Sequence, residues 1–307
     1  MKHKYPIHKD FRVLKFFRMP QNLFLLSLSN LMVRLFYSCQ LTHKQIKKTR
    51  LRIKMRDGHF LKADLFSPKQ NNDFLPCLMY YPGGAFLMNA THIHKKTIAK
   101  LVDKLQIKAV LVHYRLAPKY PFPTALYDAY DSLMYIYKAN RLFQIDIKHF
   151  GIGGDSAGGN LAAAVTLMLK EEKKNIISSQ MLIYPALDKG LSNPSRKLYT
   201  DTPMFHSRMF EVVGKHFYKN GLFGLERFAF PLQYPSFKKM PPTYLETAQF
   251  DPLHDDGKLY VDRLNEDHNI VIYNDTLGTV HGYDARVKSK ISKKSIVQRS
   301  SFLKEYL

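Results

Sequence analysis

A serine between glycines has the sequence setting that most directly indicates chemistry. Ser156 lies in the run Gly-Asp-Ser-Ala-Gly, from Gly154 to Gly158. An apolar stretch at residues 145–152 precedes this run, and a helix-forming stretch rich in Ala and Leu follows it at residues 161–169. A G-x-S-x-G pattern between a strand and a helix is typical of a nucleophilic serine held in a sharp, strained turn. The helix that follows directs the positive end of its dipole toward the hydroxyl.

A serine hydroxyl becomes an effective nucleophile only beside a base, which in turn needs an orienting group. Chains with this kind of turn carry these partners in the order Ser, then Asp or Glu, then His. Asp251 follows a predicted strand at residues 244–250, at whose carboxyl end an open α/β sheet would bind its ligand. His281 follows a further predicted strand at residues 269–273. We therefore predict that His281 is the base for Ser156 and that Asp251 orients it.

Other acidic and histidine residues near Asp251 are weaker candidates. Asp255 and Asp256 are expected in the first turn of a helix, facing solvent, where carboxylates complement the helix dipole. His254 is expected at the start of the same helix rather than on a late loop. Asp251 and His281 are therefore preferred.

Two further patterns could indicate a cofactor, and both are better explained without one. Gly151 and Gly153 begin a spacing similar to that of dinucleotide-binding loops, but Ser156 occupies the place of the third glycine. His92 and His94 have no third ligand at a spacing suited to a metal, so a helix start at the surface is expected there. The predicted chemistry requires neither a metal nor an organic cofactor.

Acyl transfer also needs backbone N–H groups directed at the developing oxyanion. A predicted buried strand at residues 76–81 runs into the sequence Pro-Gly-Gly-Ala-Phe at residues 82–86. Two consecutive glycines after a strand can turn their N–H groups into the site, so Gly83 and Gly84 are predicted donors. Ala157, the first residue after the nucleophile, is the other predicted donor.

Together these motifs resemble the hormone-sensitive-lipase-like esterases of the α/β-hydrolase fold, over roughly residues 50–285. The motifs that carry the resemblance occur in the order of that family: residues 82–86, 114–118 with 121–123, 154–159, 251–253 and 281–283. Several motifs in one order are far more specific than any motif alone. The resemblance implies a triad of Ser156, Asp251 and His281, with an oxyanion hole formed by the N–H groups of Gly83, Gly84 and Ala157.

The sequence departs from the family pattern in the loop after residues 76–81. Pro82 stands where the family usually has His, and Ala85 stands where it has the last Gly. The second change matters if the backbone of Ala85 must adopt a positive φ. Asp155, beside the nucleophile, either hydrogen-bonds neighbouring loops or complements the helix N-terminus.

The expected function is hydrolysis of small-molecule carboxylic esters with short to medium acyl chains, through an acyl-enzyme on Ser156. One alternative is an amidase, deacetylase or formamidase that uses the same triad. Another is a non-catalytic, ligand-binding relative of such hydrolases, which the complete triad disfavours.

Composition favours a globular protein without a nucleic-acid module. The chain has 307 residues, 45% of them hydrophobic, which suffices for a core. Its formal net charge is +22, but the lysines are spread along the whole chain without a basic and aromatic cluster. Specific nucleic-acid binding is therefore not expected, and the charge favours instead a weak attraction to a membrane or to another polyanion. With only Cys39 and Cys77, the chain is not expected to form a disulfide framework, and a cytoplasmic location is expected.

The N-terminal segment combines a basic start with a strongly apolar stretch at residues 21–37. Arg34 interrupts this stretch and no small-residue cleavage site follows it, so a signal peptide is not expected. The stretch is also too short and too polar to span a bilayer. Polar residues recur at three- or four-residue spacing on one narrow stripe of the predicted helix: Ser27, Asn30, Arg34 and Ser38. Such a helix is expected to bury most of its girth. The resemblance implies that N-terminal helices help to form a cap over the pocket, which is the preferred assignment here; a helix peripheral to a membrane surface is the alternative.

The remaining pattern alternates short apolar stretches with helical runs, which predicts an α/β-hydrolase fold: a mostly parallel sheet flanked by helices, with a helical cap. An antiparallel edge hairpin around Asp57 and Gly58 is expected from residues 49–56 and 60–66. Further strands are expected near residues 76–81, 109–114, 149–153, 180–184, 243–247 and 269–273, and the last is followed by a loop at 275–283.

The expected domain organisation places an N-terminal helical cap segment at residues 1–48 and the catalytic domain at residues 49–307. Between residues 188 and 230 the strand pattern lapses and aromatic and Met residues become frequent. We expect a cap insertion there, meeting the N-terminal helix above Ser156.

Overall fold

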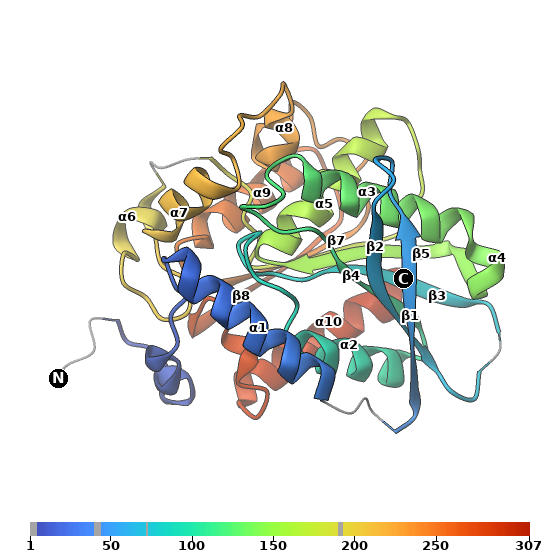
Figure 1. Ribbon diagram of the computed structural model, residues 1–307, viewed down its shortest axis with the longest axis horizontal. Helices are drawn as coiled ribbons and strands as arrows, with labels where there is room; N and C mark the ends of the chain where they lie inside the picture. The colour runs from blue at the N-terminus through green and yellow to red at the C-terminus, as the bar shows by residue number, and fades with distance from the viewer. Residues whose placement is uncertain (1–4, 40–43, 72, 190–192) are drawn as a thin grey trace.

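An eight-stranded sheet forms the centre of the protein, in the order β1-β2-β4-β3-β5-β6-β7-β8 (Figure 1). The computed structural model describes residues 5–39, 44–71, 73–189 and 193–307. The strands are β1 (Ile46–Lys54), β2 (Phe60–Pro68), β3 (Leu75–Tyr81), β4 (Lys108–His113), β5 (Ile145–Asp155), β6 (Gln180–Ile183), β7 (Thr243–Phe250) and β8 (Val271–Val280). The pairs β1–β2 and β2–β4 are antiparallel and the other pairs are parallel, so the prediction of a mostly parallel sheet is confirmed.

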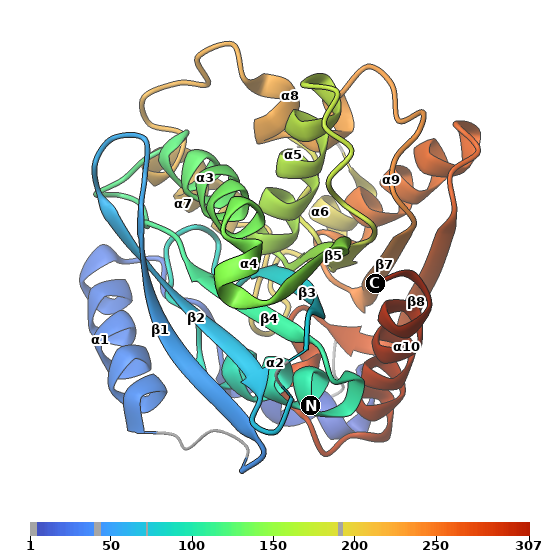
Figure 2. The same cartoon turned by 90° about the vertical axis from the view of Figure 1, so that its right-hand side faces the viewer.

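Helices cover both faces of the sheet (Figure 2). One face carries α2 (His92–Leu105) and α10 (Lys290–Tyr306), and the other carries α3 (Thr124–Lys138), α5 (Ala157–Glu171) and α9 (His254–Glu266). Successive side chains of a strand point to opposite faces, and β3 shows how this divides the core. Leu78 and Tyr80 belong to the buried cluster on the α2 and α10 side, whereas Met79 and Tyr81 belong to the cluster on the other side.

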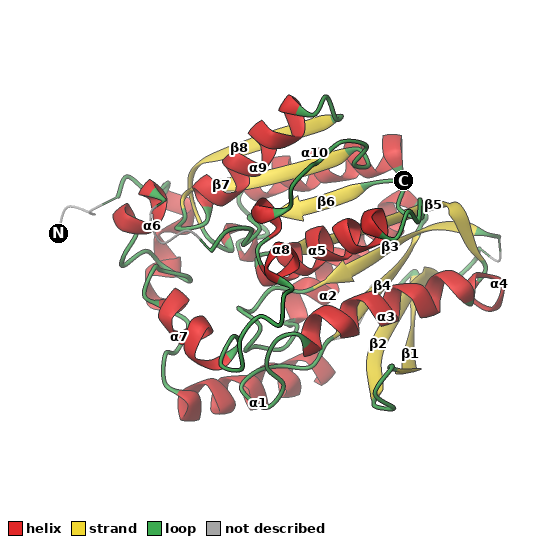
Figure 3. Cartoon of the chain, turned by 90° about the horizontal axis from the view of Figure 1, so that it is seen from above, coloured by secondary structure: helices red, strands yellow, loops and turns green. Residues whose placement is uncertain are grey.

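Shorter elements lie near the carboxyl ends of the parallel strands. They are η1 (Lys9–Phe16), α6 (Pro194–Leu198), α7 (Met209–His216), α8 (Glu226–Ala229), η2 (Pro231–Gln233) and η3 (Tyr283–Ala285), while α4 (Asn140–Phe143) precedes β5. In Figure 3 the arrowheads of β3 and β6 point toward the side of the molecule that holds α6 and α7. The N-terminal helix is α1 (Leu23–Cys39). Among the described residues, no helix has both the length and the apolar character needed to cross a bilayer.

The strands differ from the expected ones mainly at the two edges of the sheet. The hairpin is confirmed, but its turn spans residues 55–58, closed by a hydrogen bond from the Gly58 amide to the Met55 carbonyl at 2.9 Å. At the other edge, the loop expected at residues 275–283 is wrong for most of its length. β8 stays paired with β7 as far as the pair Phe250 and Val280, with a register shift on the way and a positive φ of 70° at Gly278. This break in the register interrupts the regular alternation of side chains near the end of the strand.

The orientation of α1 contradicts its predicted burial. Of its residues with described side chains, only Leu26 and Tyr37 are buried. Figures 2 and 3 both show α1 at the outer edge of the molecule. The helix instead turns a polar residue inward, because the loop after β3 offers polar partners. The Asn30 side chain donates to the Leu87 carbonyl at 2.8 Å and accepts from the Asn89 amide at 2.9 Å.

Candidate active site

The three residues of the predicted triad follow three strands of the sheet at their carboxyl ends. Ser156 follows β5, Asp251 follows β7 and His281 follows β8. The strands run in the same direction, with β6 between β5 and β7, so their carboxyl ends meet at one edge of the sheet. The positions far apart in sequence are therefore neighbours in space.

The turn at Ser156 has the strained backbone that its motif predicts. Ser156 has φ 54° and ψ −120°, a region that residues with a side chain rarely occupy. The flanking glycines are required by close backbone contacts, because an added Cβ at Gly154 would lie 2.3 Å from the Gly158 carbonyl oxygen. A Cβ at Gly158 would lie 1.9 Å from the Tyr81 carbonyl oxygen. The turn thus packs directly against the end of β3.

The side chains of Ser156, His281 and Asp251 form a continuous hydrogen-bonded chain. His281 Nε2 lies 2.9 Å from Ser156 Oγ, and His281 Nδ1 lies 2.6 Å from Asp251 Oδ2. Asp251 is fully buried, and its other oxygen accepts from the Leu253 amide at 2.9 Å. Because a carboxylate only accepts, the proton on the neutral imidazole resides on Nδ1, and Nε2 is left to accept the serine proton.

The competing residues point elsewhere. His254 lies 3.2 Å from Asp255 and 3.3 Å from Asp275, so it is not part of the chain to Ser156. The expectation that Asp256 faces solvent is wrong. Asp256 is completely buried and pairs with Arg196 at 2.6 Å, because residues near α6 cover the start of α9. Burial raises the pKa of Asp256 to about 6.

The loop between β3 and α2 is held in an unusual backbone conformation. Gly84 and Ala85 have φ values of 133° and 53°. Ala85 therefore adopts the positive φ that glycine tolerates best, and its departure from the family's glycine matters for this loop. The amides of Leu87 and Met88 both donate to the Gly84 carbonyl at 2.9 Å, which closes the turn. The hydroxyl of Tyr114, from the motif at residues 114–118, donates to the Pro82 carbonyl at 2.7 Å. These bonds fix the loop beside the serine turn.

A buried carboxylate joins this loop to the serine turn, and sequence reasoning left its role open. Asp155 accepts from the Tyr80 hydroxyl at 2.8 Å and from His94 Nε2 at 3.1 Å, and it also interacts with the Gly83 amide. His94 Nδ1 accepts from the Thr91 amide at 2.9 Å, so Nε2 carries the proton and donates. Burial raises the pKa of Asp155, but these donors outweigh burial and lower it overall. Neither Tyr80 nor His94 carries a sequence signal for this contact.

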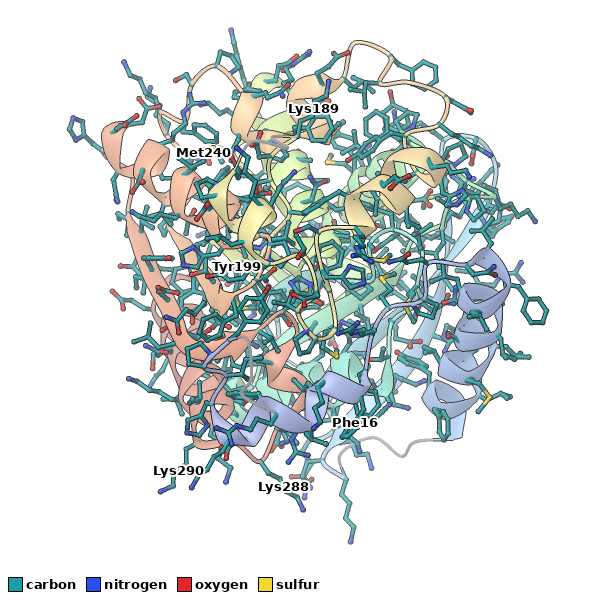
Figure 4. The ribbon with its side chains drawn as sticks, turned by 90° about the vertical axis from the view of Figure 1, so that its left-hand side faces the viewer. Phe16, Lys189, Tyr199, Met240, Lys288 and Lys290 are labelled. Atoms are coloured by element: carbon teal, nitrogen blue, oxygen red, sulfur yellow. The ribbon has the colours of Figure 1, made fainter. Side chains whose placement is uncertain are left out.

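A cavity of about 380 Å³ opens at Ser156. Its walls come from the loop after β3, from α2, from residues 16–20 ahead of α1 and from the segment around Met204 and Phe205. The Phe205 ring lies 5.0 Å from the His281 ring. A smaller cavity of about 60 Å³ adjoins Ser156 and Ala157, with a mostly apolar lining that includes Phe210 and Tyr218. Figure 4 shows this side of the molecule with its side chains.

The N-terminal segment and the predicted cap insertion meet beside this cavity. The Met204 amide donates to the Phe17 carbonyl at 2.8 Å, and the Met19 amide donates to the Met204 carbonyl at 3.0 Å. The contact is therefore made by the extended residues ahead of α1, whereas the prediction assigned it to the helix. Within the segment at 188–230, residues 190–192 lie outside the described residues.

Behind His281, a buried ionic cluster ties the loop that follows it to the C-terminal helix. Arg299 pairs with Glu246 at 2.5 Å and with Asp284 at 2.8 Å. The Tyr283 hydroxyl donates to Glu246 at 2.6 Å, and the Tyr184 hydroxyl donates to Asp284 at 2.7 Å. The sequence analysis missed this cluster, because its members come from β7, η3, α10 and the loop after β6, which are far apart in the sequence.

Comparison with known proteins agrees with the geometry. The family model described as alpha/beta hydrolase fold matches residues 78–285. The chain is 28% identical to an ethyl acetate hydrolase of Pseudomonas putida over 219 residues, which cover 70% of this chain and 69% of that protein. It is 28% identical to an arylacetamide deacetylase of Bos taurus, in an alignment that covers 75% of this chain and 73% of that protein.

Among solved structures, a bacterial heroin esterase superposes with a TM-score of 0.90, covering 98% of each chain at 24% identity. This likeness shows the fold, and the family match extends over most of the chain. The predicted α/β-hydrolase fold is thus confirmed. The chain belongs to the hormone-sensitive-lipase-like family of α/β-hydrolase fold proteins and is a carboxylesterase-type hydrolase.

Proposed function

We propose that the protein hydrolyses small carboxylic esters through an acyl-enzyme formed on Ser156. The observation that carries this proposal is the hydrogen-bonded chain from Ser156 Oγ through His281 to Asp251, at 2.9 and 2.6 Å. His281 removes the serine proton as Oγ attacks the ester carbonyl, and Asp251 stabilises the imidazolium that forms. His281 then protonates the departing alkoxide. Water activated by the same imidazole releases the acid and restores Ser156.

The oxyanion of the tetrahedral intermediate is stabilised by backbone amides of the two adjoining turns. Ala157 is the first residue of α5, so its backbone amide has no carbonyl acceptor one turn earlier in the helix and can donate to the oxyanion. Gly84 and Gly83 supply the remaining predicted donors from the loop after β3. Because the Gly83 amide also interacts with Asp155, we favour Gly84 and Ala157 as the principal pair.

The two cavities beside Ser156 differ in size, which supports separate binding sites for the acyl part and the alcohol part of the ester. The cavity of about 60 Å³ admits only a few atoms, whereas that of about 380 Å³ accepts a much larger group. We propose that a short acyl group occupies the smaller cavity and that the alcohol part extends into the larger one. Segment 188–230 then acts as a cap that sets substrate size.

Replacement of the nucleophile tests the mechanism. Ser156→Ala should lower kcat for p-nitrophenyl acetate by a factor of about 10⁴ or more and abolish labelling by a fluorophosphonate probe. Ser132→Ala is the matched control, because Ser132 is also buried but its hydroxyl donates to the Ala129 carbonyl in α3, at 3.0 Å, away from His281. The control should keep both activity and labelling. Full activity of Ser156→Ala would refute the mechanism.

Amide hydrolysis is a second candidate function, favoured by the similarity to an arylacetamide deacetylase. Matched ester and amide substrates with the same acyl group separate the two functions, because an amine is a much poorer leaving group than a phenol. We expect the ester to be cleaved faster by several orders of magnitude in kcat/KM.

A p-nitrophenyl ester series of increasing acyl length should show its optimum at short chains, and an optimum beyond medium chains would contradict the assignment of the smaller cavity.

A further inference from the structure

The outward face of α1 is an apolar surface with no covering element among the described residues. Its large exposed side chains are Leu23, Phe24, Leu25, Leu28, Leu31, Met32, Leu35 and Phe36. Phe24 is 75% exposed, and the helix forms the outer edge of the molecule in Figure 2. The polar Asn30, by contrast, is directed inward to Leu87 and Asn89. Leu26 and Tyr37 are also buried, but most of the apolar side chains of α1 face outward, unlike those of an ordinary amphipathic helix at a protein surface, which turns its apolar side to the core.

Exposed apolar side chains also occur beside the cavity at Ser156. Val13 and Phe16 on η1 and Phe17 just after it are also exposed. Phe16 and Phe17 line the cavity as well, so they lie at its opening. Figure 4 shows Phe16 at the lower edge of this side of the molecule, the edge that also carries Lys288 and Lys290. Clustered exposed apolar side chains mark interaction sites, and those of η1 border the entrance to the catalytic pocket.

The charge of the same region indicates what the surface contacts. The first 50 residues contain eleven Lys or Arg residues and a single acidic residue, Asp10. Lys9, Arg12 and Lys15 on η1 are exposed, and Arg34 is exposed on α1. The partner is therefore anionic as well as apolar. A second copy of the chain fits poorly, because it carries the same net charge of +22.

We propose that α1 and η1 form a docking surface for an anionic lipid bilayer, with α1 lying in the plane of the headgroups. Its apolar residues enter the acyl-chain boundary while the lysines and arginines contact lipid phosphates. The helix has 17 residues, a length compatible with lying on the surface, and docking places the opening at Phe16 and Phe17 against the lipid. Delivery of lipid-dissolved esters to Ser156 then follows, and this last step rests on the proposed function.

Vesicle flotation of the full chain tests the docking surface. Wild-type protein should bind phosphatidylcholine vesicles containing about 30% phosphatidylglycerol at least about tenfold more tightly than pure phosphatidylcholine vesicles, and lose this preference at high salt. The triple variant Phe24→Gln, Leu31→Gln, Leu35→Gln should bind the anionic vesicles about tenfold more weakly or worse. Glutamine is a good helix former, and none of these three residues lines the cavity, so folding and hydrolysis of soluble p-nitrophenyl acetate should persist.

A control triple variant makes the same change at exposed apolar residues of other elements. Phe74→Gln, Leu142→Gln and Leu259→Gln should leave vesicle binding unchanged, since these side chains are exposed far from α1 along the chain. Equal loss in both triple variants, or no binding of wild-type protein to anionic vesicles, would overturn the proposal. A concentration-dependent dimer that the α1 variant abolishes, without vesicle binding, would assign the surface to a second copy instead and also overturn it.

The outcome is separable from that of the proposed function. Flotation needs no catalysis, so a chain that binds anionic vesicles but cleaves no ester would refute the esterase mechanism while leaving the docking surface intact. If both proposals hold, the α1 variant should lose activity toward an ester embedded in anionic vesicles and keep its activity toward a soluble ester.

Discussion

Replacement of Asp155 should damage catalysis without removing any group that touches the ester. This carboxylate accepts from Tyr80 on β3, from His94 on α2 and from the Gly83 amide, and its own backbone precedes Ser156. It therefore fixes the distance between the nucleophile and the loop that supplies Gly84. Asp155 is a positioning residue, and its loss should appear in kcat rather than in KM.

The magnitude follows from the donors that the change leaves behind. In Asp155→Ala, the Tyr80 hydroxyl and His94 Nε2 lose bonds of 2.8 and 3.1 Å to a charged acceptor, each worth about 1.5–3 kcal/mol. Water from the adjoining cavity replaces part of this, so we expect a stability loss of about 2–4 kcal/mol. A displacement of the loop by about 1 Å would lower kcat about 100-fold. Asp155→Asn keeps an oxygen for His94 and an amide for the Tyr80 hydroxyl, so kcat should fall by only about tenfold or less.

A pair of tyrosines provides the matched control in the same strand. Tyr80→Phe and Tyr81→Phe each remove one buried hydroxyl, but Tyr81 donates to the Ala129 carbonyl at 2.9 Å, on the other side of the sheet. Both should lose about 1–2 kcal/mol in urea unfolding. Only Tyr80→Phe should lower kcat for p-nitrophenyl acetate. Equal kcat values for the two variants, together with wild-type kcat in folded Asp155→Ala, would refute the reasoning.

Three further changes probe the loop, the ionic cluster and the edge of the sheet. Ala85→Gly should leave the free energy of unfolding within about 1 kcal/mol of wild type, because relief of the positive φ offsets the lost burial and the added entropy of the unfolded chain. Ala85→Val should lower the free energy of unfolding by about 2 kcal/mol or more, and urea unfolding distinguishes the two variants. Arg299→Met should cost about 3–5 kcal/mol by leaving Glu246 buried and unpaired, and adding Glu246→Gln should restore part of that stability in the same assay. Burial of Asp64 raises its pKa, but hydrogen bonds from His113 and other neighbours lower it overall. The contribution of Asp64 to stability is therefore present above its ordinary pKa of 3.8 and is lost as the pH falls through its folded-state pKa. Asp64→Asn should lower the free energy of unfolding by about 1–3 kcal/mol at pH 7 and by progressively less below pH 3.8. Unfolding at several pH values measures both effects.

The positions of the proposed triad could be picked from the sequence because two of its members carry a local signal and the third follows from chain order. Ser156 lies in a glycine-rich turn, and Asp251 follows an apolar stretch that reads as a strand. The rule that parallel strands bring their carboxyl ends together then converts sequence order into proximity. His281 was chosen by its order in the chain, by its expected place on a late loop and by the motif at residues 281–283, although the strand before it extends to Val280 where a loop was expected. Its assignment thus did not require the correct strand boundary.

The errors arose where contacts between distant residues decide the outcome. Periodicity shows that α1 is apolar on most of its surface, but not which side packs inward, and the inward side is set by the polar contacts of Asn30. Asp256 carries the signature of an exposed first turn, yet Arg196 and the chain around it cover that turn. The partners of Asp155 are similarly remote, with Tyr80 lying 75 positions away along the chain. No local pattern encodes such pairs.

The position of the base depends on parts of the chain far from the reaction. His281 follows β8, which in the described part of the chain is an edge strand paired with β7, so the sheet supports the base from one side. The other support is the cluster in which Arg299 of α10 binds Asp284 and Glu246. Burying these charges costs desolvation free energy, which apolar side chains in the same place would not require. Asp284 lies three residues after His281, and Glu246 lies on the strand that leads to Asp251. By binding both carboxylates, Arg299 supports the backbone that carries His281 and the backbone that carries Asp251.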